Sequence, residues 1–402
     1  MLKRKLKPTS QVVSMQNEDQ HIKPEKSIVN LNFCVIIPTY NNAKTLKRVI
    51  DGVLVYAENA PIIVVNDGSS DDTSSILKEY KDKIDIINNE VNLGKGISLR
   101  KAFKYALEKG IKHAITIDSD GQHYPEDIPL FIEAAKKHPG ALLMGSRNMA
   151  QEGVPGKSSF GNKFSNFWFK VETGITLPDT QTGFRLYPLE PISKIKLFTT
   201  KFETEIEVIV KLAWKKVEII PIEINVLYDS EERVSHFRPF KDFTRISILN
   251  TYLVTLTLLY YLPLRVLAVI KKEALKKEET NLRKSVSIGF GVFMGILPIW
   301  GFQLLVGIPL AVLFKLNKVL FISAANISIP PAIPFIIYFS YLVGTPFFEN
   351  KAPITSWENL TLEAIHINFV QYFMGGTLLA IITGALFFIT ALIFLKIVRK
   401  KA

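Results

Sequence analysis

Short apolar runs alternate with amphipathic segments between residue 32 and about residue 226. The runs predict strands over residues 32–38, 61–66, 84–88, 113–118 and 141–145. Between them, residues 95–109 place apolar side chains at the i, i+3, i+4, i+7 spacing of one helix face, and residues 70–80 and 126–137 have a similar pattern. This alternation of strands and helices predicts an α/β fold with a mostly parallel sheet and flanking helices.

The last third of the chain has a different pattern. Three blocks contain no Asp, Glu, Lys or Arg: residues 285–314, 319–348 and 367–395. Each is longer than the roughly 20 apolar residues that cross a bilayer as a helix. We therefore predict an α-helical membrane domain over residues 285–402. Prolines should break the helices of the first two blocks, and these are Pro298, Pro330, Pro331 and Pro334.

The distribution of charge sets the expected topology. Residues 246–264 carry no charge, but the segment that follows, residues 265–284, is strongly basic. A crossing would carry this basic segment away from the side that holds the α/β domain, against the positive-inside rule, so we expect residues 246–264 to lie along the membrane interface. The loop 349–366 is acidic and the tail 396–401 is basic. We therefore expect a multi-pass protein of the cytoplasmic membrane, with its tail and its α/β domain in the cytoplasm.

Composition narrows the class of partner. The formal net charge is +12, from 49 Lys and Arg against 37 Asp and Glu. In a chain with membrane segments, this charge favours anionic lipid or phosphorylated substrates over nucleic acid. The single cysteine, Cys34, excludes a disulfide framework and favours a reducing compartment. The patterns divide the chain into a flexible tail (1–30), an α/β domain (31–240), an interfacial helix with a basic linker (241–284) and the membrane domain (285–402).

Polar clusters follow four of the five predicted strands. In a parallel sheet, ligands bind beyond the carboxyl ends of the strands, which is where these clusters lie. Each cluster alone is also explained as a turn or a helix cap. Four together indicate a ligand site.

Asp118 and Asp120 are the most informative pair. Side chains two residues apart on an extended segment point the same way, and two converging carboxylates are costly unless a cation or protons compensate their charge. Gln122, two residues further on, can supply a third oxygen. We expect these three residues to bind Mg²⁺ or Mn²⁺, which would neutralise a diphosphate leaving group. The alternative is a solvated acidic turn.

The order of the motifs resembles a known family. They are Val35-Ile-Ile-Pro-Thr-Tyr-Asn-Asn42, Val65-Asn-Asp-Gly-Ser-Ser-Asp71, Asn92-Leu-Gly-Lys-Gly96, Asp118-Ser-Asp-Gly-Gln-His123 and Gly145-Ser-Arg147. This set resembles the family 2 glycosyltransferases, which have the GT-A fold. The form Asp-x-Asp-x-Gln-His-x-Pro at residues 118–125 is similar to that of the dolichyl- and polyprenyl-phosphate sugar synthases. The membrane blocks resemble an integral-membrane domain of unknown function that is fused to such transferases.

The resemblance implies roles for particular residues. The donor would be bound by Pro38, Tyr40, Asp67, Lys95, Asp118 and Gln122. The catalytic residues would be Asp120, Arg147, Asp179 and Arg185, of which the last two lie in the segment that resembles the acceptor-side motif. Four further residues are candidates for binding the acceptor phosphate: Lys163, Arg233, His236 and Arg238.

The implied reaction is a single sugar transfer. The Gln-x-x-Arg-Trp sequence of many processive members is absent after residue 185. We expect transfer of one hexose, with inversion, from a nucleotide diphosphate sugar to a lipid acceptor, polyprenyl phosphate, at the cytoplasmic leaflet. A phosphate acceptor needs no strong base, whereas a hydroxyl of a glycolipid or envelope glycan would need one, and Asp179 is the candidate. Two other readings are a lipid flippase with an accessory transferase domain and a scaffold whose transferase is inactive.

Overall fold

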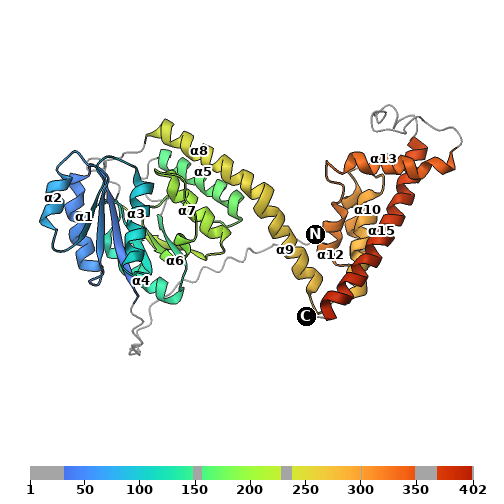
Figure 1. Cartoon of the computed structure of the whole chain (residues 1–402), viewed down its shortest axis with the longest axis horizontal. Helices are drawn as coiled ribbons and strands as arrows, with labels where there is room; N and C mark the ends of the chain where they lie inside the picture. Colours follow the sequence, from blue (N-terminus) through green and yellow to red (C-terminus); the bar gives the residue numbers. More distant parts are fainter. Residues whose placement is uncertain (1–30, 148–155, 228–237, 300, 349–368, 401–402) are drawn as a thin grey trace, which may run out of the picture. The chain divides into compact units, whose positions relative to one another are not determined.

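The computed structural model of the chain describes residues 31–147, 156–227, 238–299, 301–348 and 369–400. It divides into two compact units, Met1–Val254 and Thr255–Ala402. Figure 1 labels the helices of each unit.

A seven-stranded sheet forms the middle of the first unit, with the strand order β3-β2-β1-β4-β6-β5-β7. The strands are β1 (Phe33–Thr39), β2 (Ile62–Asn66), β3 (Asp85–Asn88), β4 (His113–Thr116), β5 (Leu142–Arg147), β6 (Arg185–Pro188) and β7 (Ile219–Ile224). β6 is antiparallel to both of its neighbours, and the other pairs are parallel. The predicted α/β fold with a mostly parallel sheet is confirmed. All five predicted strands are present, and β6 and β7 are additional.

The central strands are buried on both faces, which explains their continuous apolar runs. In β1, Cys34 and Ile36 join the core on one face, while Val35 and Ile37 join the core on the other. One core packs against α1 (Ala43–Tyr56), α2 (Thr73–Glu79) and α4 (Ile128–Lys137), which follows the short helix η1 (Pro125–Asp127). The other core packs against α3 (Lys95–Glu108), α5 (Gly156–Thr173), α6 (Leu189–Ser193), α7 (Glu203–Trp214) and α8 (Pro239–Leu256). The result is a three-layered unit (Figure 1).

Strand direction gathers the polar loops at one edge. Because β1, β2, β4 and β5 run the same way, the loops after them leave the sheet at the same edge. β6 runs the opposite way, so the segment that precedes Arg185 reaches this edge too.

The second unit is helical. After η2 (Thr257–Tyr261), its helices are α9 (Leu262–Leu275), α10 (Asn281–Ile296), α11 (Gln303–Leu313), α12 (Lys318–Ala325), α13 (Ile333–Gly344) with η3 (Thr345–Phe347), and α15 (Phe369–Lys400). The two predicted breaks are present: Pro298 lies between α10 and α11, and Pro330 and Pro331 lie between α12 and α13. Pro334, the third proline of the second block, lies in the first turn of α13, where its missing N–H has no helical partner.

Glycines let the helices of this unit touch through their backbones. A Cβ atom on Gly289 would lie 2.7 Å from the carbonyl oxygen of Gly384 in α15. Cβ atoms on Gly291 and Gly295 would each lie 2.5 Å from a carbonyl oxygen of α12. Such small-residue contacts are typical of helix packing in membranes.

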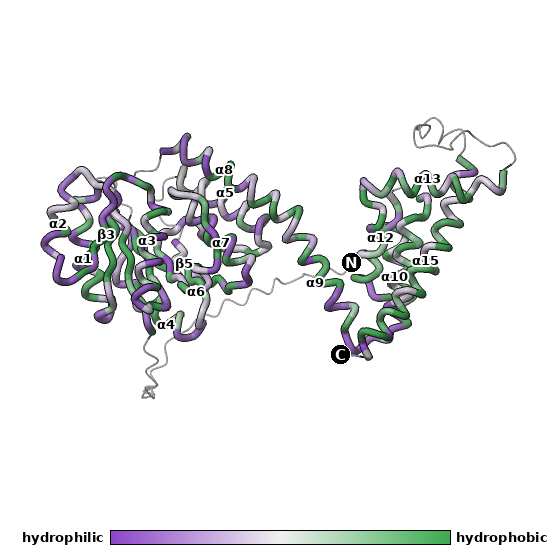
Figure 2. The backbone as a smooth tube through the Cα atoms, in the orientation of Figure 1, coloured by the Kyte–Doolittle hydropathy of each residue, from purple (hydrophilic) through white to green (hydrophobic). Residues whose placement is uncertain are grey.

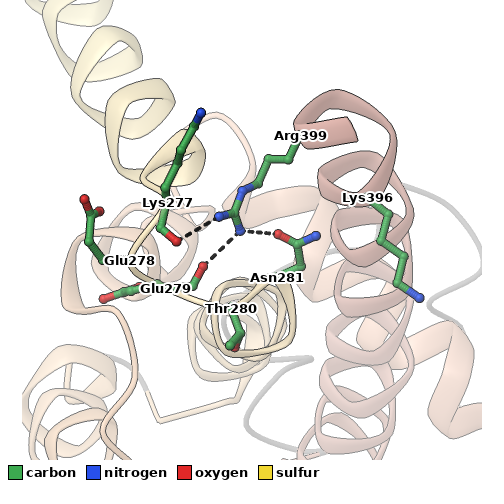
Figure 3. A pocket seen from close by; sticks show the side chains of 7 residues that line it. All are labelled: Lys277, Glu278, Glu279, Thr280, Asn281, Lys396 and Arg399. Atoms are coloured by element: carbon green, nitrogen blue, oxygen red, sulfur yellow. Dashed lines mark hydrogen bonds between the residues drawn. The ribbon is translucent and has the colours of Figure 1, made fainter. Parts of the chain in front are cut away.

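Hydrogen bonds from one basic side chain, Arg399, stabilise one end of the second unit. Arg399, near the end of α15, donates to the carbonyl oxygens of Glu279 at 2.9 Å and Lys277 at 3.2 Å, and also to the side chain of Asn281 (Figure 3). Figure 3 shows the ammonium of Lys277 pointing away from this guanidinium. Arg399 therefore joins the last turn of α15 to the segment between α9 and α10.

Two described helices are long and apolar enough to cross a bilayer, Phe240–Leu275 with 36 residues and Phe369–Arg399 with 31. Only 11% and 17% of their apolar windows are buried, unlike the core helix of a soluble protein. Hydrophobic residues run along both in Figure 2. The length of Phe240–Leu275 permits a crossing, and its interfacial placement stays a prediction, as do the domain boundaries and the number of passes. The acidic loop lies outside the described residues.

The substitution Gly289→Leu should destabilise the second unit, because its side chain would overlap the backbone of α15. We expect the apparent melting temperature of the detergent-purified protein to fall by about 5 °C. Val286→Leu, at a partly exposed position of the same helix, is the matched control. Equal melting temperatures for the two variants would contradict the backbone contact.

Candidate functional site

Hydrogen bonds tie three loops together at the carboxyl edge of the sheet. Asn42, which follows β1, donates to Ser119 Oγ at 2.8 Å, and Thr45 Oγ1 donates to the carbonyl oxygen of Ser119 at 2.6 Å. Asn41 Oδ1 accepts from the backbone N–H of Ser70 at 2.8 Å, which joins the loops after β1 and β2. Three of the four polar clusters found in the sequence, those after β1, β2 and β4, are therefore joined by hydrogen bonds.

Lys95 lies between two carboxylates. Its Nζ atom is 2.6 Å from Oδ1 of Asp118, which follows β4, and 3.1 Å from Oε2 of Glu205 in the first turn of α7. The Lys95 side chain is only 14% exposed. Burial opposes the charged form, but the two carboxylates outweigh it and raise the pKa of Lys95. Lys95 therefore remains an ammonium ion.

Two glycines allow the helices that carry Lys95 and Glu205 to approach each other. A Cβ atom on Gly96 would lie 1.9 Å from Thr204 Oγ1, and one on Gly94 would lie 2.6 Å from the carbonyl oxygen of Thr200. Gly94 also has a φ of 100°, which other residues rarely adopt. The amino termini of α3 and α7 are thus in backbone contact.

Asp118 is enclosed on its other side by Gly183. A Cβ atom at Gly183 would lie 2.1 Å from Asp118 Oδ2, so the missing side chain makes room for the carboxylate. Burial raises the pKa of Asp118, but Lys95 outweighs it, and the pKa is lowered. Asp118 is therefore ionised.

Asp120 and Gln122 lie in a turn and not on an extended segment. β4 ends at Thr116, and Gly121 has a φ of 73°. Asp120 Oδ1 accepts from the backbone N–H of Gln122 at 3.1 Å. Asp118 and Asp120 therefore lie in one loop. The prediction that they lie on an extended segment, where alternate side chains point the same way, is wrong.

His123 connects the two sides of the site electrostatically. Burial lowers its pKa to about 4, so the ring is neutral at pH 7. Asp118 and Asp179 act on the ring to raise the pKa, whereas Arg147 and Lys95 act to lower it. Charged groups of the donor side and of the acceptor side therefore both lie close enough to His123 to affect its pKa.

Asp179 holds Arg147 in place. Arg147 donates through Nε to Asp179 Oδ2 at 2.6 Å and through Nη2 to Oδ1 at 3.0 Å. Asn162 in α5 and the backbone N–H of Gln181 also donate to Oδ1, at 2.6 and 3.0 Å. Burial raises the pKa of Asp179, but Arg147 outweighs it, and the pKa is lowered. A carboxylate with these partners is a poor general base, so the geometry favours a positioning role.

Arg185, a predicted catalytic residue, is held by groups of the protein itself, and its catalytic role stays a prediction. Its side chain is fully buried. It donates to the carbonyl oxygens of Thr182 at 2.6 Å, Glu205 at 2.9 Å and Thr180 at 3.1 Å, and to the hydroxyl of Tyr187 at 3.1 Å. Four of its five N–H groups are engaged in this way. Arg185 therefore shapes the 179–185 loop from inside.

Asp67, a predicted donor-binding residue, also has protein partners, and its contact with a nucleotide stays a prediction. It accepts from the backbone N–H groups of Leu93 at 2.9 Å and Gly94 at 2.8 Å, and from a neighbouring side-chain amide. It is 4% exposed and holds the loop before α3. Pro38 is buried in β1, and Tyr40 is half-buried just beyond that strand.

The expected acceptor residues are only partly described. Lys163 is exposed on α5. Arg238 is exposed at the start of α8, where its backbone N–H donates to Asp242 Oδ2 at 2.7 Å. Arg233 and His236 lie outside the described residues.

Several buried polar atoms at this edge have no hydrogen-bond partner among the described residues. They are Thr39 Oγ1, Asn42 Oδ1, Gln122 Nε2, His123 Nδ1 and Glu205 Oε1. An unsatisfied buried polar atom costs about 1–3 kcal/mol, so a group of them marks a place where a ligand completes the hydrogen bonding.

The donor set at residues 118–122 fits a hard divalent cation. Within the described part of the chain, no three His, Cys, Asp or Glu side chains form a metal-binding group. Asp118, Asp120 and Gln122 offer two carboxylates and an amide, which are the oxygen donors that Mg²⁺ and Mn²⁺ accept alongside water and phosphate.

Comparison with known proteins identifies the family. Residues 34–196 match the family described as Glycosyl transferase family 2, and residues 264–402 match DUF2062, an uncharacterized protein conserved in bacteria. An uncharacterised protein of Methanocaldococcus jannaschii is 30% identical over 211 residues, which cover 49% of this chain and 88% of the relative. The chain belongs to glycosyltransferase family 2.

The names of two relatives of this family 2 glycosyltransferase refer to a lipid phosphate. The UDP-N-acetylglucosamine–dolichyl-phosphate N-acetylglucosaminyltransferase of Methanococcus voltae is 28% identical over 48% of this chain and 85% of the relative. The polyprenol monophosphomannose synthase of Mycolicibacterium smegmatis is 29% identical over 40% of this chain and 64% of the relative. A solved structure, the glucosyl-3-phosphoglycerate synthase of Mycobacterium tuberculosis with Mn²⁺, uridine diphosphate and phosphoglyceric acid, aligns with a TM-score of 0.43 and 18% identity, covering 57% of this chain and 78% of that one.

Three residues of the glycosyltransferase site were not anticipated in the sequence: Glu205, Asn162 and Gly183. Glu205 lies at the start of α7, beyond the segment that resembles the acceptor-side motif, and nothing local indicates its pairing with Lys95. Asn162 lies on the polar face of α5, which is a weak signal. Gly183 lies inside the acceptor-side motif, and its role depends on a contact with a distant strand.

The substitution Asp179→Asn should lower the free energy of unfolding at pH 7 by about 3–5 kcal/mol, because it leaves Arg147 without its buried partner. The folded pKa of Asp179 lies below the ordinary value of about 3.9. Its contribution is therefore present above pH ~4 and is lost as the pH falls through the folded pKa. Thermal unfolding from pH 7 to 3 should show the two proteins converging at low pH.

Asp85→Asn is the control for this prediction. Asp85 pairs with Lys109 in a partly exposed ion pair, so its loss should cost at most about 1 kcal/mol. A gap between Asp179→Asn and the native protein that stays constant down to pH 3 would rule out an ionised Asp179.

Proposed function

We propose that this chain transfers one hexose from a nucleotide diphosphate sugar to polyprenyl phosphate at the cytoplasmic leaflet, with inversion at the anomeric carbon. The observation that carries the proposal is the pairing of Arg147 with Asp179 beside the unsatisfied polar atoms of the sheet edge. The lipid-phosphate acceptors in the names of the relatives support the acceptor class.

The partners of Asp179 favour a phosphate acceptor over a hydroxyl. A hydroxyl acceptor requires a base, and Asp179 is bound to Arg147 with a lowered pKa. A phosphate monoester has a second pKa near 6 and is mostly dianionic at pH 7. Such an acceptor needs a positioned cation instead, which Arg147 provides.

The reaction is a direct displacement. An oxygen of the acceptor phosphate forms a bond to the anomeric carbon, while the bond between that carbon and the donor diphosphate breaks. The electron pair leaves with the nucleoside diphosphate, and no proton has to move. Asp118, Asp120 and Gln122 would hold Mg²⁺ or Mn²⁺, which neutralises charge on the leaving group.

An exposed aromatic surface supports a lipid acceptor. On α5, Phe160 and Phe167 are 67% and 57% exposed, and on α8 Phe240 is 87% exposed. The two helices are in contact through the rings of Phe164 and Phe243, whose centroids are 5.2 Å apart. α5 also carries Asn162, whose buried amide donates to Asp179, so the helix that bears this surface is in direct contact with the acceptor side of the site. Exposed apolar patches of this kind mark protein or membrane contacts.

The substitution Asp120→Ala should lower transfer at least about a hundredfold, because it removes a charged group from the proposed metal site. Membranes containing the protein are incubated with a panel of radiolabelled nucleotide sugars, and the labelled lipid is identified. Glu126→Gln, an exposed carboxylate near the same loop, is the control. Undiminished turnover of Asp120→Ala with added Mg²⁺ or Mn²⁺ would refute the metal assignment.

The double substitution Phe160→Ser with Phe167→Ser should lower kcat/KM for long-chain polyprenyl phosphate about tenfold, because it weakens contact with the lipid chain. For a short, water-soluble prenyl phosphate, the kcat/KM of the variant should equal that of the native protein. Val55→Ser, at an exposed apolar position of α1, is the control. Equal losses for both acceptors would show that the aromatic surface acts through folding.

A further inference from the structure

The ammonium group of Lys95 occupies a position that matters for cation binding. It forms ion pairs with Asp118, a proposed metal ligand, and with Glu205, which has no assigned role in the sequence motifs. We propose that Lys95 competes with the divalent cation for Asp118, so that the cation is taken up together with the nucleotide diphosphate and binds poorly alone. Glu205 is the positioning residue that retains Lys95 when it leaves Asp118. This inference rests on the proposed function.

The geometry makes the two occupants of Asp118 exclusive. Nζ of Lys95 is 2.6 Å from Oδ1, and Oδ2 lies against the backbone of Gly183. A divalent cation binds a carboxylate oxygen at about 2.0–2.6 Å. Two positive centres at such distances from one oxygen repel each other strongly in a site where the lysine is 14% exposed. Binding of the cation therefore requires Lys95 to move.

A nucleotide diphosphate removes this conflict. Its negative oxygens bind the cation on one side and give the displaced ammonium a new partner on the other. Cation and nucleotide thus favour each other's binding, and the coupling is reciprocal. Lys95 contributes to this coupling. Without nucleotide, its ammonium group weakens binding of the cation, and it no longer does so once phosphate oxygens are bound.

Glu205 is built to hold the displaced ammonium. It lies 3.1 Å from Nζ, and its second oxygen, Oε1, is buried without a hydrogen-bond partner. The contact of Gly96 with Thr204 fixes α7 against α3, so Glu205 cannot retreat from Lys95. The flexible stem of the lysine allows Nζ to leave Asp118 while remaining within reach of Glu205.

The test measures Mn²⁺ binding to the purified full-length protein by electron paramagnetic resonance, first with Mn²⁺ alone and then with UDP or GDP. The native protein should bind Mn²⁺ weakly alone and more tightly with the nucleotide. Lys95→Met should bind Mn²⁺ alone about tenfold more tightly, and the nucleotide should then add less. Lys104→Met, on the exposed side of the same helix, should match the native protein.

A second pair of variants isolates Glu205. Glu205→Gln should weaken binding of Mn²⁺ alone several-fold, because Lys95 then has Asp118 as its one carboxylate. In the Lys95→Met background the same substitution should have no effect. An equal effect in both backgrounds would mean that Glu205 acts only as a nearby charge, and the positioning role would be lost.

The outcomes separate this inference from the proposed function. Melting temperatures first establish that each variant is folded. If Lys95→Met binds Mn²⁺ alone no more tightly than the native protein, while nucleotide-dependent binding persists and is abolished by Asp120→Ala, the competition is refuted and the metal site stands. If no variant binds Mn²⁺ even with nucleotide, the metal assignment and the competition fail together.

Discussion

Compensation of buried charge is the constraint on which the site depends. A charged side chain removed from water without partners costs several kcal/mol, so each one at the sheet edge must meet its counterpart inside the protein. Asp179 meets Arg147, Lys95 meets two carboxylates, and Arg185 meets backbone carbonyl oxygens. Each of these contacts joins elements far apart in the sequence. The ion pairs that stabilise the folded loops therefore also determine where charged groups of a substrate can bind.

Much of the fold could be predicted because it depends on local periodicity. The apolar runs that became β1, β2, β4 and β5 are buried on both faces, and such runs are visible in the sequence. β6 was missed because it has four residues, begins with Arg185 and ends in a proline. β6 pairs with β4 in the antiparallel direction. This pairing joins residues far apart in the sequence, so no local sequence pattern predicts it. In the second unit, the prolines correctly indicated the breaks after α10 and after α12, and Pro334 lies in the first turn of α13, where a proline is compatible with the helix.

The site was predictable as a set of residue types and not as a set of partners. Strand direction alone brings Asp118 and Arg147 to one edge, and the motifs identified both. The sequence could not show that Asp67 and Arg185 are occupied by backbone groups, because those contacts depend on the loops that the two residues themselves organise. Nor could it show the contact of Lys95 with Glu205, which results from glycine-mediated packing of two helices.

The reversed strand β6 has a consequence for how this enzyme diversifies. It lies between β4 and β5, and Thr116 in β4 donates to the carbonyl oxygen of Gly183 at 2.7 Å, just before β6 begins. Asp118 and Arg147 are thus anchored to a single hydrogen-bonded framework, whereas the surrounding loops are the parts of a domain that tolerate change. Mutations in those loops can alter which sugar is accepted while leaving the separation of the two charged anchors intact. Substrate range can drift across descendants of such a scaffold while the stereochemical course of the reaction is inherited.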